Sequence, residues 1–162
     1  MISIRPATAS DVPLIRALIQ ELAAYEREPH SVHITEQQLL RDGFEDSCFE
    51  CLIAELDGAP AAFALYFPIY STWRGRSLHL EDLFVRPEFR GHGLGKALLR
   101  QVAALAVERG CARLQWDVLE WNKPAIDFYL SLDATMLDEW RRMRVVDEAL
   151  RRLAEAEARI EA

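Results

Sequence analysis

Three glycines at every second position, Gly91, Gly93 and Gly95, separate a stretch typical of a strand from a long amphipathic stretch typical of a helix. Glycine lets the backbone approach a ligand closely, and it leaves several N–H groups pointing to one side. The start of the helix adds the positive end of its dipole, so the segment predicts a cradle for an anion such as a pyrophosphate. A strand–loop–helix unit of this kind indicates an α/β fold, with a ligand crevice at the carboxyl ends of the strands.

The common nucleotide fingerprints do not fit this loop. A Walker loop requires glycine where Arg90 stands and Ser or Thr where Ala97 stands. A dinucleotide fingerprint requires Gly or Ala at the positions that Lys96 and Leu98 occupy in its two possible frames. Arg90, Lys96 and Arg100 add positive charge around the loop. A plain flexible turn is the alternative, but glycines between a strand and a helix weaken a fold unless a close approach requires them.

Hydrophobic spacing and turn residues predict the other elements around the loop. The predicted strands cover residues 2–5, 49–55, 61–70, 77–85, 112–118 and 143–146. The predicted helices cover residues 11–25, 35–43, 93–109, 122–132 and 147–161. Consecutive strands joined by short turns are antiparallel, whereas the central helix makes its two flanking strands parallel through a right-handed crossover. The predicted fold class is therefore α/β, with a mixed α+β sheet in a single domain over residues 1–162.

Composition limits the class of protein. The chain has 162 residues, of which 51% are hydrophobic and 28% charged, the balance of one ordinary folded domain. No apolar run approaches the roughly 18 residues of a membrane span. The charges at Arg5 and Asp11 are also unlike a signal peptide, so we expect a cytoplasmic protein with no membrane partner. The net charge of −7 disfavours nucleic acid as a partner and favours a cationic substrate, although solubility alone explains acidity in many proteins.

The cysteines and histidines predict neither a disulfide framework nor a metal site. Cys48 and Cys51 have C-x-x-C spacing, but residues three apart on the predicted strand face opposite ways. Cys111 has no second cysteine near it to complete a zinc site. Small buried or half-buried thiols are therefore the favoured interpretation. His30 and His33 lack a third ligand nearby and are interpreted as loop residues.

The glycine loop is one of three neighbouring motifs: Arg90-x-x-Gly93-x-Gly95, the segment 80–87 before it and the segment 122–129 after it. Together they resemble motif A, the fourth strand and the N-x-x-A-x-x-F-Y segment of the GNAT superfamily. The resemblance implies the acyl-CoA N-acyltransferase fold, a central mixed, mostly antiparallel sheet with helices on both faces. It also implies acetyl-CoA as co-substrate and no metal. The matching positions imply that acetyl-CoA contacts Leu83, Phe84, Val85, Arg90, Gly91, His92, Gly93, Leu94, Gly95, Lys96, Asn122, Pro124 and Ala125.

Further matches spread over nearly the whole chain. They are the segments 4–9, 22–26, 42–44, 80–82, 90–95, 120–122 and 128–129, together with Trp140-Arg141. They are similar to the diamine (spermidine/spermine) and thialysine N-acetyltransferases. One departure is Asp133, where the family has glycine; aspartate tolerates a left-handed conformation better than most residues. The resemblance implies a homodimer, and an acceptor that is the primary amine of a small cationic molecule. The substrate positions that it implies are Tyr25, Glu26, Glu81, Asp82 and Trp140.

The resemblance also implies a mechanism. A free alkylamine has a pKa of about 10.4, so the acceptor must lose a proton before it attacks. Glu81 matches the family's proton acceptor, directly or through water, and Asp82 stands beside it. Because strand residues alternate, we expect only one of these two carboxylates to face the cleft. A backbone N–H within residues 83–85 is expected to stabilise the oxyanion, and Tyr129 matches the acid that protonates the departing thiolate.

Alternatives stay open at the level of sequence. The same fold serves acceptors of other kinds, namely a protein N-terminus, a lysine, an antibiotic or a xenobiotic amine. A noncatalytic acyl-CoA-binding regulator is a third possibility, although it needs neither Glu81 nor Tyr129. A salt-bridged surface pair is the plain interpretation of Glu81 and Asp82, and packing is the plain interpretation of Tyr129 and Trp140.

Overall fold

Contacts along the chain divide it into two units, residues 1–119 and residues 120–162. The computed structural model describes residues 1–155, and each unit is described by itself. The single domain expected over residues 1–162 therefore stays a prediction. Every helix in the described residues is too short or too polar to span a bilayer.

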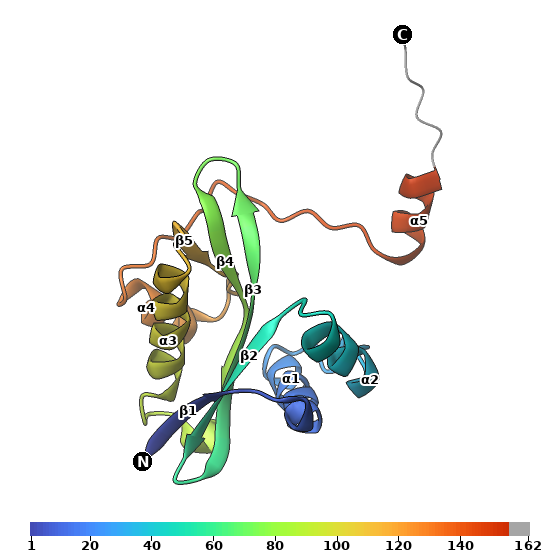
Figure 1. The fold of residues 1–162 in the computed structure, drawn as a ribbon. Helices are drawn as coiled ribbons and strands as arrows, with labels where there is room; N and C mark the ends of the chain where they lie inside the picture. The colour runs from blue at the N-terminus through green and yellow to red at the C-terminus, as the bar shows by residue number, and fades with distance from the viewer. Residues whose placement is uncertain (156–162) are drawn as a thin grey trace. The chain divides into compact units, whose positions relative to one another are not determined.

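A five-stranded sheet forms the centre of the first unit (Figure 1). Its strands are β1 Ile2–Pro6, β2 Glu50–Leu56, β3 Ala59–Ser71, β4 Gly75–Val85 and β5 Arg113–Gln115, adjacent in that order. The pairs from β1 to β4 are antiparallel, and β4 pairs with β5 in parallel. The mixed, mostly antiparallel sheet is confirmed.

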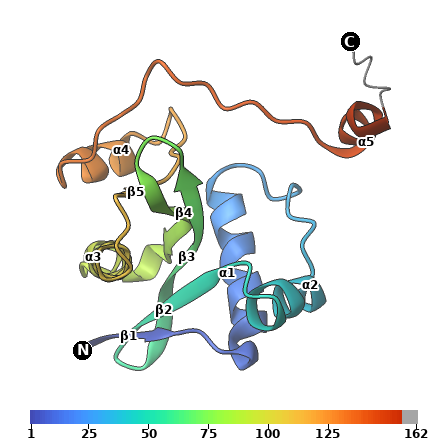
Figure 2. The same cartoon turned by 45° about the horizontal axis from the view of Figure 1, so that its top comes forward.

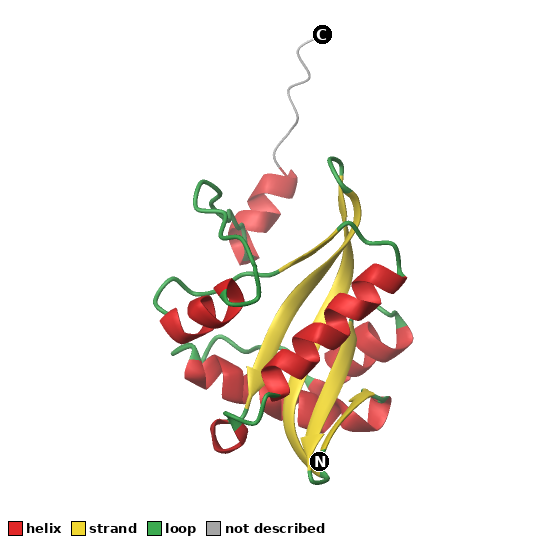
Figure 3. Cartoon of the chain, turned by 90° about the vertical axis from the view of Figure 1, so that its left-hand side faces the viewer, coloured by secondary structure: helices red, strands yellow, loops and turns green. Residues whose placement is uncertain are grey.

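Helices cover both faces of this sheet, as predicted. Figures 1 and 2 show α1 and α2 on one face, and Figure 3 shows α3 lying across the other. The α-helices are α1 Val12–Tyr25, α2 Glu36–Leu40 and α3 Leu94–Glu108. The shorter turns are the 3-10 helices Ala9–Asp11 and Pro87–Phe89 and the π-helical turn Arg41–Glu45. Thr35 caps α2 through the predicted capping box.

The core of the first unit lies on both faces of β2, β3 and β4. Val12, Ile15, Leu18 and Leu22 recur every three or four residues, so they share the buried face of α1. Their face of the sheet contributes Cys51, Ile53, Phe63, Leu65 and Phe84. The helix on the opposite face buries Leu94, Leu98, Leu99, Val102 and Ala106. Each large buried side chain stabilises the fold by about 1.5–3 kcal/mol, which keeps β4 and the loop after it fixed.

The second unit contains α4 Lys123–Leu130 and α5 Asp147–Glu155. Asn122 caps α4, because its Oδ1 accepts a hydrogen bond from the Ala125 N–H at 3.4 Å. Asp133 has a φ of +62°, so it adopts the left-handed conformation expected where the family has glycine. The last helix was expected to end at residue 161, which lies outside the described residues.

Two predicted strands differ from the structure. The strand expected over residues 112–118 is reduced to β5, because its ladder with β4 covers only residues 77–79 and ends where β4 bulges. Residues 143–146 form no strand, since no strand of the described chain pairs with them. Residues that favour a strand do not suffice, because a strand also requires a partner for its backbone.

Candidate active site

The loop between β4 and α3 has the backbone that its glycines predicted. Gly91 and Gly93 have φ values of +81° and +83°, which side chains other than glycine adopt only at a cost. A Cβ atom added at either position meets no protein atom within 4 Å, so the space beside the loop is open. Gly93 precedes the first turn of α3, whose unpaired N–H groups begin at Leu94. The loop therefore presents an open helix N-terminus, the geometry that favours a phosphate group.

Arg90 links this loop to the end of α1. Its Nε donates a hydrogen bond to the Val85 carbonyl at 3.1 Å. Its guanidinium lies over the Tyr25 ring, 4.7 Å from the centroid. The structure thus brings together a predicted cofactor residue and a predicted substrate residue. His92 stays within the loop, since its Nδ1 lies 3.1 Å from the Arg90 carbonyl oxygen.

A second arginine fixes the strand end that leads into the loop. Arg86 donates to both carboxylate oxygens of Glu21 on α1, at 2.9 and 2.8 Å. It also donates to the Pro60 carbonyl at 2.9 Å. The sequence interpretation gave Arg86 no role beyond the end of the strand. An arginine directly after a strand and a glutamate on the polar side of a helix are too common to reveal this pairing.

A β-bulge in β4 places the two predicted acidic residues. Tyr66 on β3 pairs with Leu80, and Leu65 pairs with Asp82, so Glu81 has no cross-strand partner. The extra residue in the strand shifts the alternation of side chains. The strict alternation behind the expectation that only one of Glu81 and Asp82 faces the cleft is therefore interrupted at this point, and the expectation itself stays a prediction. Asp82 lies opposite Leu65 on the face that α1 covers, and Glu81 contacts His79, which lies opposite Phe67 on that same face.

The position of Glu81 follows from its contact with His79. The Nε2 atom of His79 lies 3.1 Å from Oε2 of Glu81. His79 is buried opposite Phe67, and the two ring centroids lie 5.1 Å apart. Phe67 in turn packs against the core under α1. Sequence reasoning missed His79; the available signal was its position two residues before Glu81 on one strand, which puts both side chains on one face.

Three carboxylates gather near the end of α1 and the bulge in β4: Glu26, Glu81 and Asp82. Burial and, to a smaller extent, the nearby charges of Glu81 and Glu26 together raise the pKa of Asp82 to about 7. Burial also raises the pKa of Glu26, with a further contribution from Glu81. Mutual repulsion of this kind is relieved by a bound cation. The site is therefore suited to an ammonium group.

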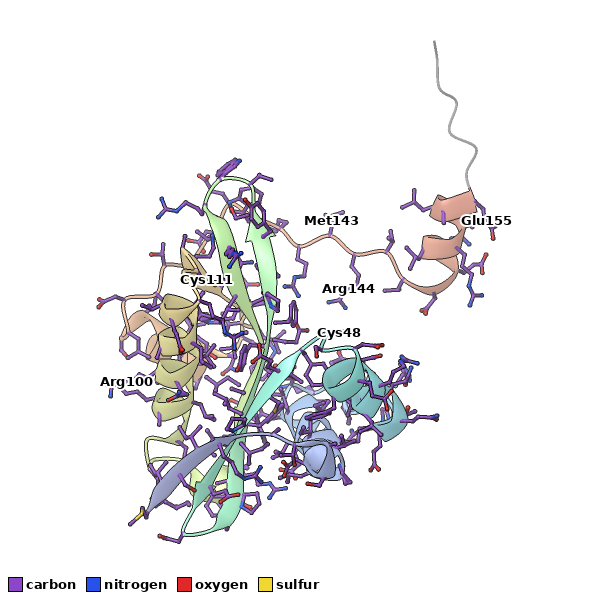
Figure 4. All side chains as sticks on the ribbon, viewed as in Figure 1. Cys48, Arg100, Cys111, Met143, Arg144 and Glu155 are labelled. Carbon is purple, nitrogen blue, oxygen red and sulfur yellow. The ribbon has the colours of Figure 1, made fainter. Side chains whose placement is uncertain are left out.

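The other predicted residues lie in the second unit or on the outside of the first. Tyr129 lies on α4, with its ring centroid 5.2 Å from that of Phe128. Trp140 is 68% exposed. The pairing of Tyr129 and Trp140 with the carboxylates of the first unit stays a prediction. Arg100, labelled in Figure 4, projects outward from α3. Lys96 is exposed in the first turn of that helix.

The cysteines are free thiols at separate places (Figure 4). Cys48 is exposed in the loop before β2, which begins at Glu50, so Cys48 and Cys51 do not lie on one strand. Cys51 is buried on the core face of β2, and burial raises the pKa of its thiol. Among residues 1–155, no three His, Cys, Asp or Glu side chains are grouped as metal ligands.

Comparisons with known proteins agree with this geometry. Residues 15–133 match the model of the acetyltransferase (GNAT) family. The chain is 42% identical to thialysine N-epsilon-acetyltransferase of Sus scrofa, over 93% of this chain and 96% of that protein. An integron cassette protein from the mobile metagenome of V. cholerae has a TM-score of 0.79 and 25% identity, over 96% of this chain and 98% of that one. A predicted acetyltransferase of Clostridium acetobutylicum, solved with acetyl-CoA, has a TM-score of 0.73 and 20% identity, over 89% and 96% of the two chains.

Proposed function

The chain belongs to the acetyltransferase (GNAT) family, and we propose that it moves the acetyl group of acetyl-CoA to the primary amine of a small cationic acceptor. Membership confirms the predicted fold and the predicted class of enzyme, an acetyltransferase. The observation that carries the proposed acceptor is the cluster of Glu26, Glu81 and Asp82 beside the glycine loop. The thialysine acetyltransferase at 42% identity supports the same class of acceptor.

The glycine loop is proposed to hold the pyrophosphate of acetyl-CoA. The open space at Gly91 and Gly93 and the N-terminus of α3 fit an anion of that size. Lys96 in the first turn of α3 supplies positive charge. The end of β4, residues 83–85, is proposed to run beside the rest of the co-substrate, because its ladder with β5 has ended and its backbone groups face no neighbouring strand on that side. Asn122, Pro124 and Ala125 at the start of α4 are proposed to complete the site.

The carboxylates are proposed to prepare the amine. An ammonium entering the cluster meets Glu26, Glu81 and Asp82, which favour its charge. Glu81 then accepts one proton, which leaves a neutral amine able to attack the acetyl carbonyl. A backbone N–H of residues 83–85 stabilises the oxyanion, and Tyr129 gives its proton to the departing thiolate. Tyr25 and Trp140 supply aromatic faces for the alkylammonium chain.

The extra carboxylates favour an acceptor with a second positive charge. One ammonium loses its proton to Glu81, while the other stays charged beside Glu26 or Asp82. Polyamines, diamines and thialysine share this chemistry, and an antibiotic, lysine or N-terminal acceptor shares it only in part. The reaction is proposed to take place in the cytoplasm, in keeping with three free cysteine thiols.

An acetyl-transfer assay over a panel of amines tests the proposal. Thiol release from acetyl-CoA is followed with diamines, polyamines, thialysine, matched monoamines, an aminoglycoside and a peptide N-terminus. We expect dications to give the highest kcat/KM. Equal activity with monoamines contradicts the proposed acceptor but leaves the acetyltransferase in place. No thiol release with any amine contradicts both.

A further inference from the structure

His79 has a buried imidazole ring that contacts the carboxylate of Glu81. It is 7% exposed, and its Nε2 lies 3.1 Å from Oε2 of Glu81. A carboxylate only accepts hydrogen bonds, so Nε2 carries the hydrogen whether the ring is neutral or charged. His79 therefore donates to Glu81, and its tautomer is fixed by that contact.

The ring of His79 is held more firmly than the carboxylate that it contacts. It lies between Phe67 of β3 and Gln115 of β5, its register partners on the two sides of β4. Its ring centroid lies 5.1 Å from that of Phe67, with the planes tilted by 33°. The Glu81 side chain is 48% exposed, and the bulge leaves its residue without a partner on β3. The contact thus ties a half-exposed side chain to a buried one.

We propose that His79 is a positioning residue that holds Glu81 by its Oε2 atom and leaves Oε1 for the acceptor amine. The inference rests on the proposed function, in which Glu81 takes the proton of the ammonium. That proton moves from the acceptor nitrogen to Oε1, while His79 keeps its own hydrogen throughout. The charges around the pair, Glu26 and Asp82, are carboxylates that push Glu81 away from them, so a donor on its other side keeps it in place.

A structural ion pair and a positioning contact differ in what they change. A pair with a partner as exposed as Glu81 adds little to the stability of the fold. Misplacement of a reacting group by about 1 Å lowers a rate by up to roughly 100-fold. The loss of His79 should therefore lower kcat far more than it lowers the melting temperature or raises the KM for acetyl-CoA.

Three variants at position 79 separate the donor from the packing. His79→Phe keeps a ring against Phe67 and removes the donor. His79→Gln carries an amide N–H at about the reach of Nε2, whereas His79→Asn is one methylene shorter. We expect roughly tenfold or greater loss of kcat in His79→Phe and His79→Asn, and recovery of most turnover in His79→Gln. The Gln and Asn pair gives the same comparison if the Phe variant folds poorly.

A double-mutant cycle with Glu81→Gln decides whether His79 acts through Glu81. If it does, His79→Phe lowers kcat in the wild-type background and has no further effect in Glu81→Gln. Equal loss in both backgrounds, or full turnover in His79→Phe with an inactive Glu81→Gln, overturns the inference and leaves the proposed function intact. Full turnover in Glu81→Gln instead contradicts Glu81 as the proton acceptor, and the positioning role ends with it.

Discussion

The residue that couples the site to pH is Asp82. Its pKa is raised to about 7 by burial and by two carboxylate neighbours, above the ordinary value of 3.8. The folded state therefore keeps a proton that the unfolded chain loses. The stability that this proton gives is complete below pH 3.8 and is lost as pH rises through about 7.

Asp82→Asn removes this dependence, because the amide never ionises. Near pH 4, where little of this stability has yet been lost, the variant and the wild type should have similar melting temperatures. At pH 8 the variant should be the more stable of the two, since only the wild type then buries a carboxylate. Thermal unfolding of both proteins across this range measures the difference. Asp138 is exposed in the second unit, so Asp138→Asn is the control, and its melting temperature should follow that of the wild type across the pH range. If the melting temperature of Asp82→Asn also follows that of the wild type, the raised pKa of Asp82 is refuted.

A substitution at a second residue, Glu26, tests the proposed acceptor. Its pKa is raised by burial and by Glu81, so a second ammonium in the cluster relieves both residues. Glu26→Gln should raise the KM for a diamine or for thialysine much more than the KM for a matched monoamine, with a modest change in kcat. Added salt should weaken capture of the dication in the wild type more than in the variant. Equal effects on monoamines and dications rule out Glu26 as the contact for the second charge.

At the scale of elements, the loop after β4 and the hairpin turn after β2 each contain a glycine in the left-handed conformation, and these two glycines form a matched pair for substitution. Gly93 and Gly58 have φ values of +83° and +82°, and a Cβ at either meets no atom within 4 Å. Gly93→Ala and Gly58→Ala should each cost about 1–2 kcal/mol of stability through backbone strain. Only Gly93→Ala should lose the rise in melting temperature that saturating acetyl-CoA gives. Loss of that rise in both variants, or a wild type that responds to NAD and ignores acetyl-CoA, contradicts the loop as the pyrophosphate site.

The elements also differ in how far the sequence predicts them. Apolar spacing of three and four residues was sufficient for α1 and α3, and glycine spacing was sufficient for the loop. The bulge in β4 was not predicted, because a bulge adds one residue without any special composition. One trace of it is present: Leu80 and Leu83 lie three apart, yet both pair with residues of the β3 face turned away from α1. The acidic site depended on that single residue, since strict alternation would have separated Glu81 from Asp82.

At the scale of the whole molecule, the chain exposes a set of large apolar side chains after α4. Met136, Leu137, Trp140, Met143, Val145 and Val146 are each at least 48% exposed. Scattered exposed apolar residues are ordinary, but six of them within eleven residues lead us to expect an interaction surface here. The segment 143–146 was predicted as a strand and has no strand partner in the described chain. In the described chain, strand β5 is paired on one side only, so its other backbone edge is open to pairing with a further strand.

We therefore expect a homodimer, in which this segment of one copy is covered by the other. Sedimentation at micromolar concentration should give a species of twice 18.5 kDa. Val145→Lys places a charge in the segment and should shift the species toward the monomer, because burial of an unpaired ammonium is costly. Leu153→Lys makes the same change on α5, at a residue 64% exposed, and should leave the dimer intact. A wild type that sediments only as a monomer removes the proposed dimer, and an equal response to both lysines moves the interface away from residues 143–146.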